Sequence, residues 1–586
     1  MDDRPAKRLK VASSDAHHQE PTGPTIDCSD DPTNPSSSRS GRSLASLTRS
    51  ITPPPRPRSR LPSQSQQSSV TGVSTHQAGD QNVPKLISSP IQLTNIRDLP
   101  ASSGNNVDTI RLRDILGDPM IRECWQFNFL HDVDFIMSQF DEDVRALVQV
   151  KIVHGSWKKE APNRIRIDEQ CARYPNVEAI TAYMPEPFGT HHSKMMVILR
   201  HDDLAQVIIH TANMIPGDWA NMCQAVWRSP LLPLSNTSKS AEPASSIVGS
   251  GARFKRDLLS YLGAYGSKKT GQLVKQLEKH DFGAVRAALI ASIPSKQKVN
   301  DMDSKKASLW GWPALKDTLR NVPLLQEKST PGSSKKPHII IQISSIASLG
   351  QTDKWLKETF FESLCPSALN RPKFSIIFPT PDEIRRSLNG YGSGGSIHMK
   401  LQSAAQQRQL QYMRPYLCHW AGDREDPISD RMGGGTNAVK CEAGRRRAAP
   451  HIKTYVRFSD AASMDRIDWA MVTSANLSTQ AWGAAPNANG EVRICSWEIG
   501  VMVWPELFAG SENEGRVEMV PCFKRNTPSS DLIQTLEGRD STVPSAIVGF
   551  RMPYDLPLTP YSATDIPWCA TSSHSEPDWL GQTWEG

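Results

Sequence analysis

The sequence predicts an α/β protein of two similar halves that follow a long N-terminal segment. Short β-rich runs alternate with helical stretches beyond residue 105, which is typical of an α/β fold. One motif occurs twice: a His-x-Lys opens an apolar run, and a second apolar run then ends in Asn. A repeat of this kind indicates a duplicated unit. The first 105 residues are instead rich in Ser, Pro, Thr and Gln.

Residues 1–105 are expected to be disordered, because their few apolar side chains cannot bury enough surface to offset the entropy lost on ordering. Lys7-Arg8-Leu9-Lys10 in this segment resembles a short nuclear-localisation signal. We therefore expect the protein to reside in the nucleus.

Composition narrows the class of protein further. With 586 residues the chain is long enough for two domains of ordinary size, and its net charge of +6 does not by itself identify a nucleic-acid partner. The ten cysteines form no Cys-x-x-Cys and no zinc-type spacing, which indicates free thiols, a reducing compartment and no metal or other cofactor. No apolar run approaches the ~18 residues of a membrane span, and the N-terminus lacks a secretory signal. We expect a soluble intracellular protein without a membrane partner.

Hydrophobic periodicity divides the folded part into residues 106–300 and 301–586, with the polar stretch 295–304 at the join. The strands expected in the first half lie at 148–153, 195–199 and 207–209, and the helices at 255–265 and 271–280. The strands expected in the second half lie at 338–343, 374–378, 452–458, 469–472 and 500–504.

The repeated motif has the same parts in both halves, namely His192, Lys194, Asn213 and Trp219 in the first and His451, Lys453, Asn476 and Trp482 in the second. The spacing from Lys to Asn is 19 residues in one copy and 23 in the other, and Trp follows each Asn six positions later. A third His-x-Lys, at His398, has no Asn at either spacing. We interpret it as chance or a surface loop.

These residue types suit the cleavage of a phosphodiester without a metal. Negative charge grows on the non-bridging oxygens in the transition state, and Lys and Asn provide fixed donors for it. One neutral imidazole attacks phosphorus, and a second, protonated imidazole delivers a proton to the leaving oxygen. A strand that starts at His-x-Lys presents both side chains on one face, so Ser193 and Ile452 between them would point the other way and carry no expected role.

Both motifs resemble those of the phospholipase D superfamily, and in particular those of tyrosyl-DNA phosphodiesterases. The wider superfamily has an Asp five residues after the Lys, whereas this chain has Leu199 and Phe458, in agreement with the tyrosyl-DNA branch. The similarity to that family extends to residues 183–192, 450–455 and 473–478. The resemblance implies two phospholipase D-like α-β-α sandwich domains related by pseudo-two-fold symmetry.

The same resemblance implies roles for single residues. His192 would be the nucleophile that forms a phosphohistidine, and His451 the acid that protonates the tyrosyl leaving group and later activates water. The phosphate would be bound by Lys194, Lys453, Asn213 and Asn476. Gln224 and Glu498 would orient the two imidazoles, and which of them serves which His stays open. The bound DNA would be lined by Phe188, Ser345, Ser348 and Ser478.

The implied activity is that of a metal-free DNA-repair phosphodiesterase. It would hydrolyse the 3′-phosphotyrosyl bonds of topoisomerase I adducts and other 3′-end blocks, an exonuclease-type reaction. Its partners would be single-stranded or nicked DNA ends bearing tyrosyl peptide and, through residues 1–105, repair proteins, with the enzyme acting as a monomer. Three alternatives remain: a phospholipid hydrolase or transferase of the same superfamily, a metal-free endonuclease, and a non-catalytic protein that binds DNA ends.

Overall fold

The computed structural model describes residues 84–235, 247–301, 303–324, 336–365, 371–421, 441–510, 515–529 and 544–586. The disorder expected for residues 1–83 lies outside the described residues. For residues 84–105 the expectation was wrong, because β1 (Lys85–Ile87) and β2 (Ile91–Leu93) are strands. Alternating apolar side chains of β2 are buried, a local pattern that the average composition of the segment conceals.

The first half is built on a seven-stranded sheet in the order β2-β8-β7-β6-β3-β4-β5. After β2, its strands are β3 (Ile121–Phe127), β4 (Gln149–His154), β5 (Val177–Thr181), β6 (Met195–Arg200), β7 (Ala205–His210) and β8 (Ala225–Arg228). β3, β4 and β5 are parallel to one another, whereas β6 runs antiparallel to β3 and to β7.

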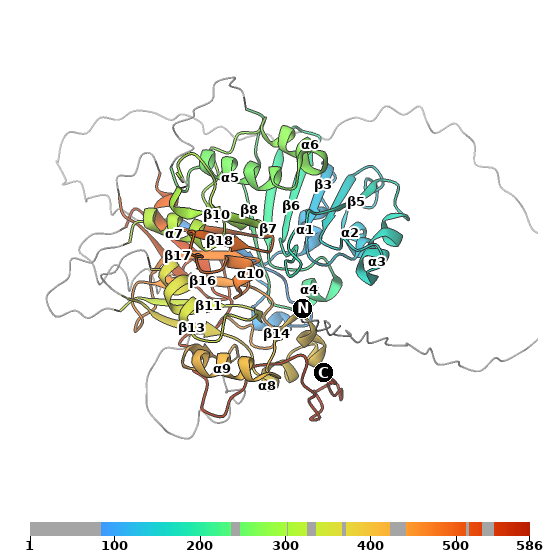
Figure 1. Cartoon of the computed structure of the whole chain (residues 1–586). Coiled ribbons are helices and arrows are strands. Elements are labelled where there is room, and N and C mark those ends of the chain that lie inside the picture. Colours follow the sequence, from blue (N-terminus) through green and yellow to red (C-terminus); the bar gives the residue numbers. More distant parts are fainter. Residues whose placement is uncertain are drawn as a thin grey trace, which may run out of the picture. The chain divides into compact units, whose positions relative to one another are not determined.

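Helices cover both faces of this sheet, because β6 alternates apolar residues between them. Met195, Val197 and Leu199 share a core with α5 (Gly251–Gly263) and α6 (Ser267–Leu277). Met196 and Ile198 belong to a separate core with the helices α1 (Leu112–Leu116), α2 (Val133–Gln139) and α3 (Pro162–Cys171). Figure 1 shows α5 and α6 in green and α2 and α3 in blue-green. The predicted α-β-α sandwich is confirmed for this half.

The second half repeats the plan with a seven-stranded sheet in the order β15-β13-β11-β16-β17-β19-β9. Its strands are β9 (Ala288–Ser292), β11 (His338–Gln342), β13 (Lys373–Ile377), β15 (Leu417–Cys418), β16 (Thr454–Phe458), β17 (Ile467–Thr473) and β19 (Glu498–Val503). Its helices are α7 (Gly311–Asn321), a π-helix (Trp355–Phe361), α8 (Pro381–Arg385) and α9 (Ala404–Met413). Strand for strand, β6 corresponds to β16 and β7 to β17, so the two motifs occupy equivalent places.

The polar stretch 295–304 is not the join between the halves. β9 lies before it, yet pairs with β19 of the second sheet, with Ala291 opposite Ile499. Within the stretch, β10 (Ser295–Lys298) pairs with β18 (Glu491–Ile494). The chain therefore enters the second half at or before residue 288, and β10 forms a separate two-stranded sheet with β18 of that half.

The remaining elements connect or extend the two halves. β1 forms a small parallel sheet with β21 (Ala546–Arg551) and β20 (Val517–Cys522), and β12 (Ser345–Ile346) pairs with β14 (His398–Met399). The short helices α4 (Pro216–Ala220) and α10 (Thr479–Trp482) follow the two motif asparagines. One cluster of buried side chains runs from the first sheet through α5, α6 and α7 to the second, so a shared core holds the halves together.

Candidate active site

The two His-x-Lys motifs meet where the halves join. β6 and β16, the fourth strands of their sheets, each begin one residue after the Lys, so His and Lys precede the strand rather than opening it as expected. Backbone bridges connect His191 to Trp497 and Cys223 to Pro450. Residues next to each motif are thus paired with the opposite half.

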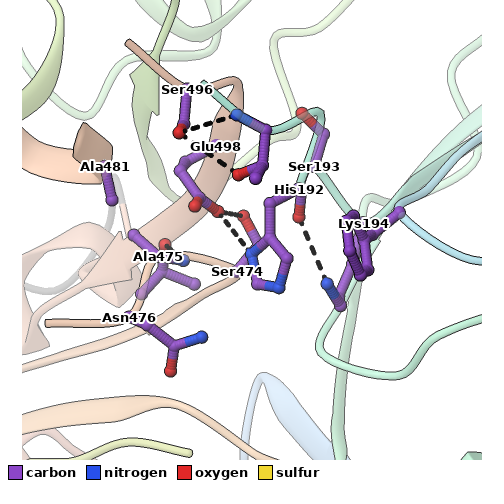
Figure 2. Close-up of polar contacts among 12 residues, drawn as sticks. His192, Ser193, Lys194, Ser474, Ala475, Asn476, Ala481, Ser496 and Glu498 are labelled. Carbon is purple, nitrogen blue, oxygen red and sulfur yellow. Dashed lines mark hydrogen bonds and ion pairs between the residues drawn. The ribbon is translucent and has the colours of Figure 1, made fainter. Parts of the chain in front are cut away.

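Glu498 of the second half orients His192 of the first. Glu498 Oε2 accepts a hydrogen bond from His192 Nδ1 at 3.0 Å and another from the Ser474 hydroxyl. Figure 2 shows the carboxylate between these two side chains, with His192 on the green ribbon of the first half and Ser474 on the orange ribbon of the second. Because a carboxylate only accepts, Nδ1 carries the proton and the Nε2 lone pair is left for attack on phosphorus.

Asp218 and Gln224 of the first half surround His451 of the second. His451 Nδ1 lies 3.1 Å from Asp218 Oδ2 and 2.9 Å from Gln224 Nε2. The Gln224 carbonyl oxygen accepts from the Thr211 hydroxyl, so its Nε2 is a donor and donates to Asp218 at 3.2 Å. The imidazole and the amide therefore both donate to Asp218. Glu498 thus contacts His192 and Gln224 contacts His451, but the group that accepts from His451 Nδ1 is Asp218 rather than Gln224.

Asp218 is a site residue that the sequence reasoning missed. It is 1% exposed, and it also accepts from the backbone N–H of Asn213 at 2.6 Å. A signal existed, because Asp218 directly precedes the Trp shared by both copies of the motif, where the second copy has Ala481. Comparison of the two motif copies highlights only the positions at which they are identical. Asp218 stands at a position where the copies differ, so the comparison did not reveal it.

Lys194 and Lys453 are both fully buried, and each donates from Nζ to the carbonyl of the His in its own motif, at 3.2 and 2.5 Å. Burial lowers the pKa of Lys194 to about 8, although the charge of Glu498 opposes the shift. Burial, and then the charge of Lys194, lowers the pKa of Lys453 well below its ordinary value. Two poorly hydrated ammonium groups are costly unless an anion joins them, and a phosphodiester is such an anion.

The motif asparagines provide the remaining donors. Asn476 Oδ1 accepts from the backbone N–H groups of Ser344 and Ser345 at 3.1 and 2.9 Å, so its NH2 group is the free end. Asn213 is 3% exposed, and its Oδ1 has no hydrogen-bond partner among the residues that the structure describes. The NH2 group of Asn476 is therefore available to donate to a bound ligand.

Both imidazoles are neutral in the ligand-free site. Burial lowers the pKa of His192 to about 4, against the opposing charge of Glu498. Burial, and then the charge of Lys453, lowers the pKa of His451 to about 3. A neutral His192 is ready to act as a nucleophile. His451 needs a proton to act as an acid, and a bound phosphate raises its pKa by countering the charge of Lys453.

Tyrosines of α5 hold the two neighbours of His192. His191 Nδ1 donates to the Asn128 carbonyl at 3.0 Å, so the neutral ring accepts at Nε2 from the Tyr265 hydroxyl at 2.9 Å. Tyr265 in turn accepts from Tyr261 at 3.1 Å, and Tyr261 accepts from the Ser193 hydroxyl. Ser193 therefore has a structural partner, although no role was expected for it. Ile452, its counterpart in the second motif, has no hydroxyl with which to make such a bond.

Trp497 links this chain of hydroxyl groups to the carboxylate at the site. Its ring stacks on Tyr265 with centroids 3.8 Å apart, and its carbonyl accepts from the His192 backbone N–H at 3.0 Å. Because Trp497 directly precedes Glu498, the same packing positions the nucleophile and the group that orients it.

The residues expected to line DNA differ in exposure. Phe188, four positions before His192, is 79% exposed. Ser348 is exposed, Ser345 is half-buried, and the half-buried Ser478 caps α10 by accepting from Ala481 N at 3.0 Å. A DNA contact for these four residues stays a prediction.

Phe129 is an aromatic residue of the site that the sequence did not single out. Its ring centroid lies 5.6 Å from that of His192, and 39% of the residue is exposed. It follows β3 by two residues, so only the pairing of β3 with β6 brings it to the nucleophile.

The third His-x-Lys is not a stray surface loop. His398 lies in β14, which pairs with β12 so that His398 stands opposite Ser345. Ser345 in turn donates to the catalytic-motif residue Asn476. The position is exposed, as a surface loop would be, but it lies in a two-residue strand rather than in a loop.

The described part of the chain contains no helix long and apolar enough to span a membrane. All cysteines within it are free, and none of its His, Cys, Asp and Glu side chains gather in threes or more in a way that suits a metal ion.

Comparisons with known proteins agree with this geometry. The sequence profile of the family described as "Tyrosyl-DNA phosphodiesterase" matches residues 90–562. The probable tyrosyl-DNA phosphodiesterase of Schizosaccharomyces pombe is 32% identical over 556 residues, which span 85% of this chain and 96% of that protein. Tyrosyl-DNA phosphodiesterase 1 of Arabidopsis thaliana is 27% identical over 82% of this chain and 74% of its own length. The crystal structure of the yeast tyrosyl-DNA phosphodiesterase covers 82% of this chain and 98% of its own, with a TM-score of 0.55 and 21% identity.

The fold and the site define a phosphodiesterase of the phospholipase D type, in which two similar halves contribute His, Lys and Asn to one centre. Within that class, the chain belongs to the tyrosyl-DNA phosphodiesterase family. The resemblance inferred from the motifs is confirmed.

Proposed function

We propose that this protein hydrolyses the bond between tyrosine and the 3′ phosphate of DNA through a covalent phosphohistidine at His192. The observation that carries the proposal is the exchange of orienting groups between the halves. Glu498 sets the tautomer of His192, and Asp218 sets that of His451. Family membership supports the reaction class, and the two buried lysines support an anionic ligand.

In the first step, His192 Nε2 attacks phosphorus, a P–N bond forms, and the bond from phosphorus to the tyrosyl oxygen breaks. His451 gives its Nε2 proton to that oxygen, which leaves as the tyrosine hydroxyl. A phenol with a pKa near ~10 is a tolerable leaving group when a protonated imidazole assists. The Lys and Asn donors stabilise the charge that grows on the non-bridging oxygens.

In the second step, His451 accepts a proton from water while the water oxygen attacks phosphorus and the P–N bond breaks. The products are DNA with a 3′ phosphate, a neutral His192 and a protonated His451. His451 loses its proton when the phosphate leaves the site and regains one when the next substrate binds. One proton is thus held between two coupled imidazoles. A bell-shaped dependence of rate on pH follows, with two apparent pKa values that belong to the pair.

We infer that the protein acts on single-stranded or nicked DNA 3′ ends, including topoisomerase I adducts and other end blocks. We also infer that it acts as a monomer and resides in the nucleus. The basic cluster at Lys7-Arg8 supports the location, and residues 1–105 are the segment through which repair proteins would be recruited.

A single assay tests the function. An oligonucleotide ending in 3′-phosphotyrosine is incubated with the protein in EDTA, and wild type should release tyrosine and leave a 3′ phosphate whereas His192→Ala should not. Turnover of phospholipid vesicles with the oligonucleotide untouched would identify a phospholipase. Nicking of closed plasmid DNA would identify an endonuclease, and binding of DNA ends without turnover, unaffected by His192→Ala, would identify a non-catalytic binder.

A further inference from the structure

The third His-x-Lys lies one strand away from a catalytic-motif residue. His398 N donates to the Ser344 carbonyl at 3.0 Å, and His398 stands opposite Ser345 in the parallel pair of β14 and β12. The N–H groups of Ser344 and Ser345 both donate to Asn476 Oδ1. Neighbouring strands are ~4.8 Å apart, so this pairing extends from Asn476 across β12 to β14. We call the surface formed by Ser345, His398 and Lys400 the ledge.

The side chains of this ledge alternate between the core and solvent. Met399 is 2% exposed, whereas His398 and Lys400 on either side of it are exposed. Residues two apart in an extended segment point the same way, so His398 and Lys400 share the solvent-facing side. Residues directly opposite each other on adjacent strands also share a face, which puts the side chain of Ser345 on the same side as His398.

The ledge is electropositive. The pKa of His398 is lowered, first by partial desolvation of the ring and then by the positive charges of Lys453 and Lys400. The buried ammonium of Lys453 is therefore close enough to act on this imidazole through space. Within the described residues, neither His398 nor Lys400 forms an ion pair with a carboxylate.

We propose that His398 and Lys400 bind the sugar-phosphate backbone of the substrate strand beside the phosphate that reacts. This inference rests on the proposed function, because it takes the ligand of the site to be a nucleic-acid 3′ end. Lys400 supplies a charge for one further phosphate, and His398 supplies a ring N–H donor next to the Ser345 hydroxyl. The surface that would line the DNA thereby extends from Ser345 and Ser348 to the neighbouring β-strand β14.

The test measures the affinity of the full chain for a fluorescent single-stranded oligonucleotide with a 3′ phosphate over a series of salt concentrations. Lys400→Ala should weaken binding several-fold and reduce the slope of log affinity against log salt by about 0.7, the value for one phosphate contact on a single strand. His398→Ala should weaken binding with little change of slope near neutral pH, because the imidazole is uncharged there. Lys400→Arg should keep both the affinity and the slope.

Lys373→Ala is the matched control. Lys373 is also exposed, but it lies in β13 of the seven-stranded sheet, opposite His338 at the start of β11, whereas the ledge belongs to the separate pair of β12 and β14 that follows the end of β11. Its loss should leave affinity and slope unchanged. An unchanged slope in Lys400→Ala, or an equal loss in Lys373→Ala, would overturn the inference.

Turnover separates this inference from the proposed function. A mononucleotide 3′-phosphotyrosine has no further phosphate, so wild type and Lys400→Ala should cleave it equally, which also shows that the variant is folded. A wild type that binds oligonucleotides through Lys400 but cleaves neither substrate would refute the proposed function and leave the binding surface standing. Cleavage of both substrates with no effect of Lys400→Ala would refute the binding surface alone.

Discussion

Glu498 and His192 come from different halves of the protein, yet the carboxylate of one accepts a hydrogen bond from the ring of the other at 3.0 Å. The reverse crossing pairs Asp218 of the first half with His451 of the second at 3.1 Å. Each imidazole is thus oriented by the half that does not carry it. Neither half alone contains a complete nucleophile or a complete acid.

Replacement of Glu498 by Gln tests the first of these crossings. An amide can present either a donor or an acceptor to His192, so the ring is no longer held with its proton on Nδ1. We expect kcat on a 3′-phosphotyrosyl oligonucleotide to fall at least ~10²-fold with little change in KM, as when a buried carboxylate that orients a catalytic His is neutralised. Ser474→Ala leaves the carboxylate in place but removes its second hydrogen bond and the acceptor of the Ile499 N–H, and it should lower kcat less. An unchanged kcat in Glu498→Gln would refute the role.

Asp218→Asn should impair the second step more than the first. Water is a far weaker acid than the tyrosine hydroxyl, so its activation depends more on a well-oriented His451 than the departure of the phenol does. The covalent DNA adduct should therefore accumulate in Asp218→Asn and not in Glu498→Gln, where attack itself is slow. Quenched reactions on denaturing gels measure both. Equal amounts of adduct in the two variants would speak against this division of labour.

Tyr265→Phe tests the hydroxyl chain behind the nucleophile. It removes the donor to His191 Nε2 and leaves that buried nitrogen unpartnered, which should cost about 1–3 kcal/mol of unfolding free energy. We also expect a lower kcat at an unchanged KM, because His191 precedes His192. Tyr561→Phe is the control, since it removes a similar bond to the Phe378 carbonyl. If it lowers stability and kcat in the same proportion, the tyrosine chain has no special role in catalysis.

Acid should destabilise the protein through its buried imidazoles. Burial is the first cause that lowers the pKa to about 3 or 4 in each of His191, His192, His210 and His451. In the unfolded chain these groups titrate near ~6.5, so below that pH the unfolded state binds more protons and the free energy of unfolding falls as pH drops toward about 4. The contribution is fully present above the unfolded-state pKa.

Urea unfolding at several pH values measures this slope. Each imidazole that titrates only on unfolding contributes about 1.4 kcal/mol per pH unit, so four of them should give a decline several times steeper than one. His192→Gln should make the decline shallower by one such step. A flat stability between about pH 5 and 7 would show that these rings bind as many protons in the folded state as in the unfolded state, which would contradict the lowered pKa values.

The catalytic motifs were predictable because they are local and repeated. In each copy, His, Lys and Asn lie within about one strand-turn-strand unit. The same pattern occurs twice, which argues against chance. The strands that carry them are short apolar runs, so β6, β7, β16 and β17 were also placed within a few residues. Their shared site follows from the equivalent places of the two motifs in sheets of the same order.

What escaped prediction depends on contacts between distant segments. No periodicity near residue 288 reveals that β9 pairs with β19, more than 200 positions later. The pairing of Glu498 with His192 has the same origin, because it arises when the halves close. His398 was set aside since its sequence lacks the partner Asn, whereas its position depends on β12, a strand of two residues. Asp218 has no counterpart in the second copy and thus no repeat to mark it.

The covalent bond between phosphorus and His192 is the central claim, and a trapped intermediate tests it most directly. His451→Ala removes the group that activates water, so reaction with a 3′-phosphotyrosyl oligonucleotide should leave DNA attached to the protein. Proteolysis and mass spectrometry should then find the phosphate on His192, with no adduct in the double variant that also carries His192→Ala. An adduct on another residue, or one that persists in the double variant, would contradict the account.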